Sequence, residues 1–241
     1  RTGDYMLSSA QDYRAGKPGY QQHPWQATLG IDAVVFTNHP GSDDERARPN
    51  FWAGNGILPR VAQHENVLVC IHHVPADDPF PFSHAYFPKA AFDEVIERAG
   101  WLFGRKGEGY IALYSQHALR WYGDQHIAGN PVNEARAEAP TNAWIVEMGR
   151  AADWGTLDAF VDALAAATVT MNGEGHELTV AYASPSAGVV HFGWHGPLLV
   201  GGAVVALHDY PRFDNPYCHA EFATRQYTIQ MGGEAYAINF A

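Results

Sequence analysis

Hydrophobic and polar residues alternate along much of this chain, which is the pattern of half-buried β-strands. The clearest case surrounds Gly30-Ile31-Asp32, where two alternating runs meet at a glycine suited to a tight turn. Pairing outward from this turn sets Ala27 against Val35 and His23 against His39. Directly opposed residues have Cβ atoms about 4.5–5.5 Å apart. The hairpin therefore predicts that these two imidazoles lie close together.

Other patterns predict the remaining elements. Residues 66–73 are apolar on both faces, which indicates a central strand covered on both sides. Residues 156–168 predict an amphipathic helix, with Thr156 as its N-cap and apolar side chains at helical spacing. A shorter helix is expected over residues 90–98, with Gly100 as its stop. After residue 168, strands recur about every ten residues between glycine or proline breaks, as in antiparallel sandwiches.

These patterns predict a mainly β fold: a large antiparallel two-sheet β-sandwich with one or two peripheral helices. We expect residues 1–241 to form a single domain. The stretch 123–142, rich in Gly, Pro, Asn, Ala and Glu, is either a boundary or a long crossing between sheets.

Composition narrows the choice of partners. The net charge of −11, from 15 basic and 26 acidic residues, argues against nucleic acid, because phosphate binding needs basic patches. No apolar run reaches the roughly 18 residues of a membrane-spanning helix, so a soluble protein is expected. Cys70 lies in an apolar run and is expected to be buried. Cys70 and Cys218 leave the compartment open, either extracytoplasmic or cytoplasmic.

One loop combines aromatic and planar polar side chains. Within residues 48–60 lie two glycines, two prolines, and Arg48, Asn50, Trp52, Asn55 and Arg60. Planar donors beside an aromatic face suit a sugar ring or a uronate carboxylate. The loop thus predicts a substrate-binding role for the four residues from Asn50 to Arg60. The alternative is a structural loop whose aromatic rings fill the core.

His84 and Tyr86 are two residues apart on one strand face and predict a general acid/base couple. In lyase chemistry a tyrosinate abstracts the proton α to a uronate carboxylate, while an arginine such as Arg48 neutralises that carboxylate. The alternative is an aromatic cluster of Phe82, Tyr86 and Phe87 that packs the core.

The chain has 13 histidines, and the predicted hairpin singles out His23 and His39. Zinc or another divalent metal suits two imidazoles with a third ligand, for which His73 is the first choice and His64 the second. The alternative is a set of hydrogen-bonded core imidazoles. A GxSxG nucleophile motif and phosphate-binding glycine motifs are both missing from the sequence.

Three segments, Gln22–Leu29, Phe36–Gly41 and Arg48–Gly56, resemble the β-sandwich part of bacterial heparinase II/III-like proteins. The resemblance implies that an (α/α) toroid precedes the sandwich and that uronate-containing polysaccharides are cleaved by β-elimination in the groove between them. It also implies a zinc ion, which some members hold through His and Asp on neighbouring strands. The toroid is absent from this chain, so an upstream segment or a partner chain would have to supply it.

We therefore expect the sandwich portion of a polysaccharide-degrading enzyme, with a lyase as first choice and a polysaccharide or oligosaccharide as substrate. A non-catalytic carbohydrate-binding or assembly module, in which Trp52 and Trp25 stack on sugars, is one alternative. A portion of a glycoside hydrolase is the other, and it would need two carboxylates at a suitable separation.

Overall fold

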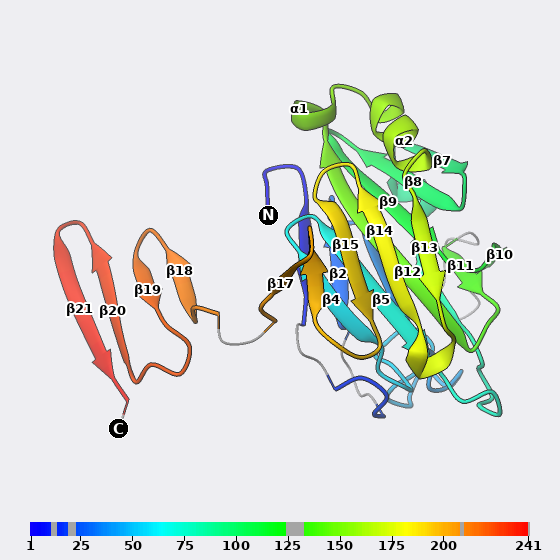
Figure 1. The fold of residues 1–241 in the computed structure, drawn as a ribbon, viewed down its shortest axis with the longest axis horizontal. Helices are drawn as coiled ribbons and strands as arrows, with labels where there is room; N and C mark the ends of the chain where they lie inside the picture. Colours follow the sequence, from blue (N-terminus) through cyan, green and yellow to red (C-terminus); the bar gives the residue numbers. More distant parts are fainter. Residues whose placement is uncertain (11–13, 19–22, 124–132, 208–209, 241) are drawn as a thin grey trace.

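The computed structural model describes residues 1–10, 14–18, 23–123, 133–207 and 210–240. Its strands form antiparallel sheets that stack into a sandwich, with two short helices at one end (Figure 1). The predicted mainly β sandwich with one or two peripheral helices is confirmed. Within the described residues, no helix has the length and apolar character needed to cross a membrane.

Two six-stranded sheets form the main sandwich. The first sheet has the order β1-β2-β3-β6-β11-β10, and the central sheet has the order β4-β5-β12-β9-β8-β7. The strands of the first sheet, in that order, are Met6–Ser9, Trp25–Thr28, Val34–Asn38, Ser83–Tyr86, Glu134–Ala137 and Leu119–Tyr122. Those of the central sheet are Arg60–His64, Val67–His73, Thr141–Arg150, Gly109–Ser115, Trp101–Lys106 and Glu94–Arg98.

A third sheet and two helices cover the other face of the central sheet. The third sheet has the order β13-β14-β15-β16-β17, and α1 and α2 follow β12. The strands of the third sheet are Val169–Asn172, Thr179–Ser184, Gly188–Gly193, Leu198–Val200 and Ala203–Val205. The helices α1 and α2 are Ala151–Trp154 and Leu157–Ala165. Two 3-10 turns elsewhere in the chain order, η1 and η2, span Lys89–Ala91 and Gly175–Glu177.

Strand β5 shows why the central sheet is buried on both sides. Leu68 and Cys70 point into the apolar cluster shared with the first sheet. Val69 and Ile71 point into the cluster shared with α2 and the third sheet. The predicted doubly covered strand and the predicted burial of Cys70 are both confirmed. The two-sheet sandwich thus carries an additional layer that the sequence pattern did not separate from it.

The predicted first hairpin is present in the predicted register. Ala27 pairs with Val35, and Leu29 N–H donates to the Ala33 carbonyl oxygen over 2.9 Å. The paired part is short, however, since its register covers Ala27 with Val35 and Thr28 with Val34, and the other edge of β3 pairs with β6 from Phe36 onward.

The predicted amphipathic helix is α2, and Thr156 Oγ1 accepts a hydrogen bond from Ala159 N–H as its N-cap. The short helix predicted over residues 90–98 is wrong. Residues 94–98 form β7, which pairs with β8 through a two-residue turn at Ala99 and Gly100. Both turn residues have positive φ, 52° and 81°, as a tight hairpin turn requires.

The predicted irregular stretch 123–142 is partly regular. It contains β11 in the first sheet and the start of β12 in the central sheet, so residues 138–140 lead from one sheet to the other. Residues 124–132 lie outside the described part of the chain.

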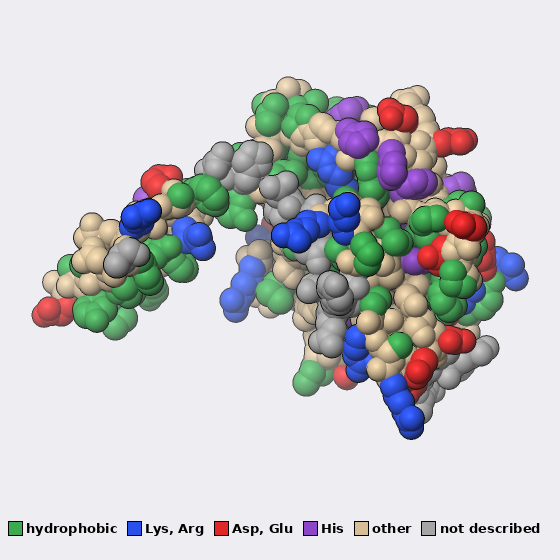
Figure 2. All heavy atoms as spheres, turned by 90° about the horizontal axis from the view of Figure 1, so that it is seen from below, with side chains coloured by type: hydrophobic (Ala, Val, Ile, Leu, Met, Phe, Trp, Pro, Cys, Tyr) green, Lys and Arg blue, Asp and Glu red, His purple; other side chains and the backbone are tan. Residues whose placement is uncertain are grey.

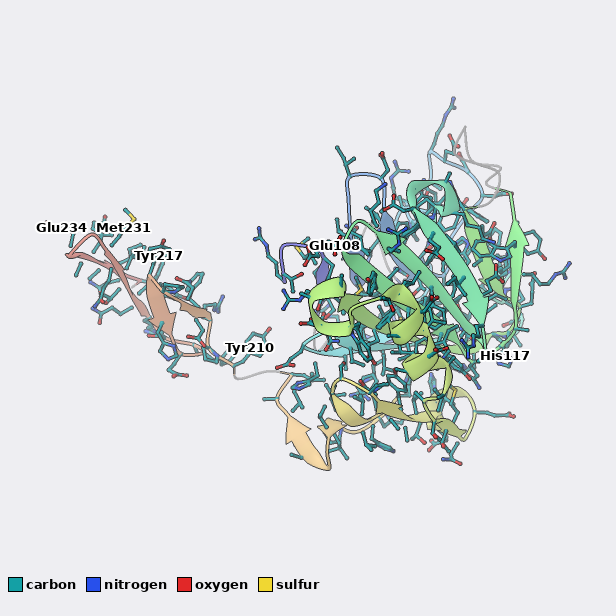
Figure 3. All side chains as sticks on the ribbon, turned by 90° about the horizontal axis from the view of Figure 1, so that it is seen from above. Glu108, His117, Tyr210, Tyr217, Met231 and Glu234 are labelled. Atoms are coloured by element: carbon teal, nitrogen blue, oxygen red, sulfur yellow. The ribbon has the colours of Figure 1, made fainter. Side chains whose placement is uncertain are left out.

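Residues 210–240 form two hairpins that stand beside the sandwich (Figures 1 and 3). Their strands are β18 to β21, at Phe213–Asn215, Cys218–Ala220, Gln226–Met231 and Glu234–Asn239. We call these residues the C-terminal unit. None of the three apolar clusters of the described chain includes a residue of this unit.

Candidate functional site

The most distinctive side chains cover the outer face of the first sheet. Strand alternation turns Val35 and Thr37 toward the central sheet and Phe36 toward the outside, where the loop of residues 39–59 folds over it. Tyr86 is the directly opposed residue on β6. The resulting aromatic cluster consists of His23, Phe36, Phe51, Trp52, Phe82, His84 and Tyr86.

Buried side-chain amides hold the loop in place. Asn38 Nδ2 donates to the carbonyl oxygens of Phe51 and Gly54, over 3.0 and 2.9 Å. Asn55 Oδ1 accepts from His39 N–H, and Asn50 Oδ1 accepts from Trp52 and Ala53 N–H. These bonds satisfy backbone groups that a loop cannot pair internally. The loop is therefore a fixed platform for Trp52.

Trp52 is the centre of the aromatic cluster. Its ring stacks on His84 at a centroid distance of 4.1 Å and meets Phe36 and Tyr86 edge-on. His23 stacks on Phe36 at 3.9 Å and its Nε2–H donates to the Trp52 carbonyl oxygen over 2.6 Å. The Trp52 Nε1–H is buried and has no hydrogen-bond partner among the described residues.

A polar triad of the buried residues His84 and Glu134 with the half-buried Arg136 lies under Trp52. His84 Nδ1 is 2.9 Å from Glu134 Oε1, and Arg136 Nε donates to the same oxygen over 2.9 Å. His84 Nε2 faces the Phe51 carbonyl oxygen at 3.1 Å. The Arg136 guanidinium lies over the Phe82 ring at 4.0 Å. The triad joins β6, β11 and the loop.

Burial and the partners of the triad act on its pKa values in opposite directions. Burial lowers the pKa of His84, and the Glu134 hydrogen bond and charge oppose that shift. For Glu134, burial favours the neutral acid, but His84 and Arg136 together bring its pKa below the ordinary value. Glu134 is therefore a carboxylate that is buried and paired.

Above the triad, the cluster leaves an open pocket of about 310 Å³. Among the described residues, its lining is mainly aromatic and its one charged side chain is Glu45. The lining consists of His23, Phe36, Glu45, Asn50, Phe51, Trp52, Ala53 and Tyr86. Such a surface suits a sugar ring, which has an apolar face and hydroxyl groups at its edge.

The three predicted catalytic residues do not converge in this pocket. Tyr86 lines it, and His84 lies beneath it with no solvent exposure and both ring nitrogens facing acceptors. Arg48 is exposed, and its Nη1 donates to the backbone oxygens of Glu45 and Ala47. The predicted acid/base couple of His84 and Tyr86 is therefore divided, because Trp52 covers the histidine.

The predicted substrate-binding residues also separate into two groups. Trp52 and Asn50 line the pocket. Asn55 is fully buried, and Arg60 donates to the carbonyl oxygens of Gly193 and Gly196 while covering the Phe192 ring. Asn55 and Arg60 thus stabilise the loop and the third sheet, and their predicted contact with substrate has no geometric support.

The predicted pairing of His23 with His39 does not occur. Pro24 precedes β2, and His23 turns to the outer face, where it contacts Phe36. His39 instead points to the loop of residues 75–82: Nε2–H donates to the Phe80 carbonyl oxygen over 3.0 Å, and Nδ1 accepts from Ile57 N–H over 2.9 Å. These bonds fix one neutral tautomer of His39.

His73 is also separated from this pair. It lies on the face of β5 that meets the third sheet, where its ring contacts His176 and Trp194. Its neighbour His72 is the residue that faces the first sheet, 3.2 Å from Thr37 Oγ1. In the described part of the chain, no group of three or more His, Cys, Asp or Glu side chains is arranged to hold a metal ion. The predicted set of His23, His39 and His73 is therefore wrong as a single site.

Sequence patterns missed three residues that organise this site: Asn38, Glu134 and Arg136. Glu134 and Arg136 lie on β11, inside the stretch predicted to be irregular, and their partner His84 is far away in the sequence. The alternation of Glu134 and Arg136 with Ala135 and Ala137 was the available signal. Comparison of the chain with models of protein families, with curated proteins and with solved structures gives no match.

Proposed function

We propose that this chain binds a glycan in the pocket above Trp52 and serves as the sandwich portion of a polysaccharide-degrading protein. The observation that carries the proposal is the aromatic pocket on a loop held by buried amides. A volume of about 310 Å³ is at the lower end of the range for ligand pockets, roughly 300–1,000 Å³. That size suits one sugar unit of a longer chain.

Of the hollows that are larger than this pocket, the two largest fit a glycan less well. One, of about 670 Å³, is largely polar and lies beside Arg150 and Asp153, which pair with each other. The other, of about 620 Å³, is an apolar surface of the C-terminal unit that includes Phe213 and Tyr227. Neither places an aromatic face beside buried loop amides, so the Trp52 pocket is the better candidate.

Trp52→Ala tests this proposal by calorimetric titration with neutral and uronate-containing oligosaccharides. We expect a loss of affinity of at least tenfold, since about 1.4 kcal/mol corresponds to a factor of ten. Trp52 also packs on His84, so a second variant is needed that removes no contact. Ala53→Trp fills the pocket and should block binding, while Trp121→Ala, outside the pocket, should leave it unchanged. Unchanged affinity in both pocket variants would refute the proposal.

Lyase activity is the second candidate, and it is favoured by the position of Tyr86 in the pocket lining. In this proposal the ionised Tyr86 abstracts the proton α to a uronate carboxylate, a double bond forms as the glycosidic C–O bond at the β carbon breaks, and the leaving oxygen takes up a proton. Arg48 approaches the carboxylate, and a helical toroid or partner chain completes the groove. The test is absorbance from unsaturated uronate products on incubation with acidic glycans. Tyr86→Phe should stop turnover and leave binding in place. Binding without any turnover would favour the non-catalytic module.

A further inference from the structure

A second group of histidines lies outside the aromatic cluster. His73 ends β5, His176 lies in η2, and His195 lies in the turn between β15 and β16. The ring centroids are 4.3 Å apart for His73 and His176, and 6.3 Å apart for His176 and His195. Figure 2 shows histidine side chains gathered on the end of the molecule that is seen from below.

His176 and His195 lie at the surface of the protein. Both residues are exposed, and neither makes a hydrogen bond or ion pair within the described residues. In contrast, the ring nitrogens of His39 and His84 are used by protein partners. An exposed imidazole with a free nitrogen is the form that binds a transition-metal ion.

The surroundings hold the His176 ring and the backbone on either side of His195 in position. His73 Nδ1 lies 2.7 Å from Thr141 Oγ1, and its ring packs edge-on against His176. Trp194 lies 4.8 Å from His176 and forms the floor of the group. Arg60 donates to the carbonyl oxygens of Gly193 and Gly196, on either side of His195. Less ordering of the protein is therefore needed when a ligand binds.

We propose that His176 and His195 together bind one divalent transition-metal ion, such as Zn²⁺, Ni²⁺ or Cu²⁺. Their centroid separation of 6.3 Å is compatible with two imidazoles on either side of one ion, given Zn–N bonds of about 2.0–2.1 Å. Water completes the coordination sphere, because the described chain offers no group of three ligating side chains. His73 is a positioning residue. The ion ties η2 to the turn that follows β15, at the open end of the third sheet.

The fluorescence of Trp194 provides a local readout. Added Ni²⁺ or Cu²⁺ should quench it, because the indole lies beside His176, and Zn²⁺ should compete without quenching. Trp194→Phe should remove most of the metal-dependent quenching and keep the calorimetric binding of Ni²⁺. Quenching that is undiminished in Trp194→Phe would place the ion elsewhere and overturn the proposal.

Variants of the two ligands complete the test. His176→Ala and His195→Ala should each weaken Ni²⁺ binding at least tenfold and abolish the rise in melting temperature that Ni²⁺ produces in the unsubstituted protein. His191→Ala, at an exposed position on β15, is the matched control and should behave like the unsubstituted protein. Equal Ni²⁺ affinity in all three variants and the unsubstituted protein would overturn the proposal.

Discussion

Glu147 on β12 is fully buried, and its carboxylate accepts hydrogen bonds from Tyr182, Ser184 and Ser186 over 2.6, 2.8 and 2.7 Å. Burial and the Glu147 charge raise the pKa of Tyr182, so its hydroxyl stays a donor. Glu147→Leu would leave these donors without a partner. We expect the free energy of unfolding to fall by about 3 kcal/mol in urea titrations.

The same substitution at Glu94 is the control. Glu94 lies on the exposed edge strand β7 with Arg105 at 3.5 Å, and a surface pair contributes at most about 1 kcal/mol. Equal losses in the free energy of unfolding for Glu147→Leu and Glu94→Leu would show that the buried hydrogen bonds do not stabilise the folded protein.

His72 predicts a pH dependence of stability. It is buried between the first and central sheets, and burial, followed by the charges of His39 and His84, lowers its pKa well below the ordinary value. The unfolded chain therefore takes up a proton near pH 6.5 that the folded chain does not. Stability is fully present above about pH 6.5 and decreases below it, by up to about 1.4 kcal/mol per pH unit for one such group.

Urea titrations at several pH values between neutral and mildly acidic conditions measure this slope. His72→Gln removes this one group and should make the dependence shallower, whatever its effect on stability at neutral pH, while His23, His39 and His84, whose pKa values burial also lowers, keep part of the slope. His191→Gln is the control, because His191 is exposed. An identical slope in His72→Gln and the unsubstituted protein would contradict the assignment.

At the scale of elements, α2 packs on the central sheet at Gly149 of β12, where the strand has no side chain. A Cβ atom at Gly149 would lie 2.8 Å from the Phe160 ring and 3.0 Å from Trp154. Gly149→Ala should therefore overpack this contact and lower the free energy of unfolding by about 1–3 kcal/mol. Gly3→Ala, where nothing lies within 4 Å, is the control, and a matching small effect at both positions would show that α2 can shift freely.

Elements whose signals are local were predictable from the sequence. The cap at Thr156, the apolar run of β5 and the turn near Gly30 each act within a few residues. The exception among local signals is β7, because Gly100 predicts the end of a helix whereas Ala99 and Gly100 form the turn of a hairpin. Val95 and Ile96 fit the period of a helix as well as that of a strand, and pairing with β8 selects the strand.

The candidate site was predictable only in part, because its partners come from distant strands. The loop with Trp52 was found from its own composition. His23 and His39 do not pair, because the ladder between β2 and β3 ends at Ala27 and Val35 and His23 lies against Phe36 on the outer face of the sheet. The Glu134 partner of His84 depends on the alignment of β6 with β11, which no local pattern fixes.

At the scale of the whole molecule, exposed apolar side chains are concentrated in the C-terminal unit. Eight of the twelve large apolar side chains that are exposed in the described chain lie there. They are Tyr210, Phe213, Tyr217, Phe222, Ile229, Met231, Tyr236 and Phe240. Figure 3 shows Tyr217 and Met231 on hairpins that stand apart from the sandwich. Such a patch marks an interaction surface or an aggregation hazard.

Because the C-terminal unit shares no apolar cluster with the sandwich, we expect the sandwich to fold without it. A chain that ends at residue 207 should keep its melting temperature within a few degrees, since about 1 kcal/mol shifts it by roughly 2–4 °C in a domain of this size. Binding of a hydrophobic dye should fall at the same time. Met231→Ser with Tyr236→Ser in the full chain is the matched control, because it lowers the apolar exposure and keeps the hairpins. A large drop in melting temperature after truncation would show that the unit packs on the sandwich in solution.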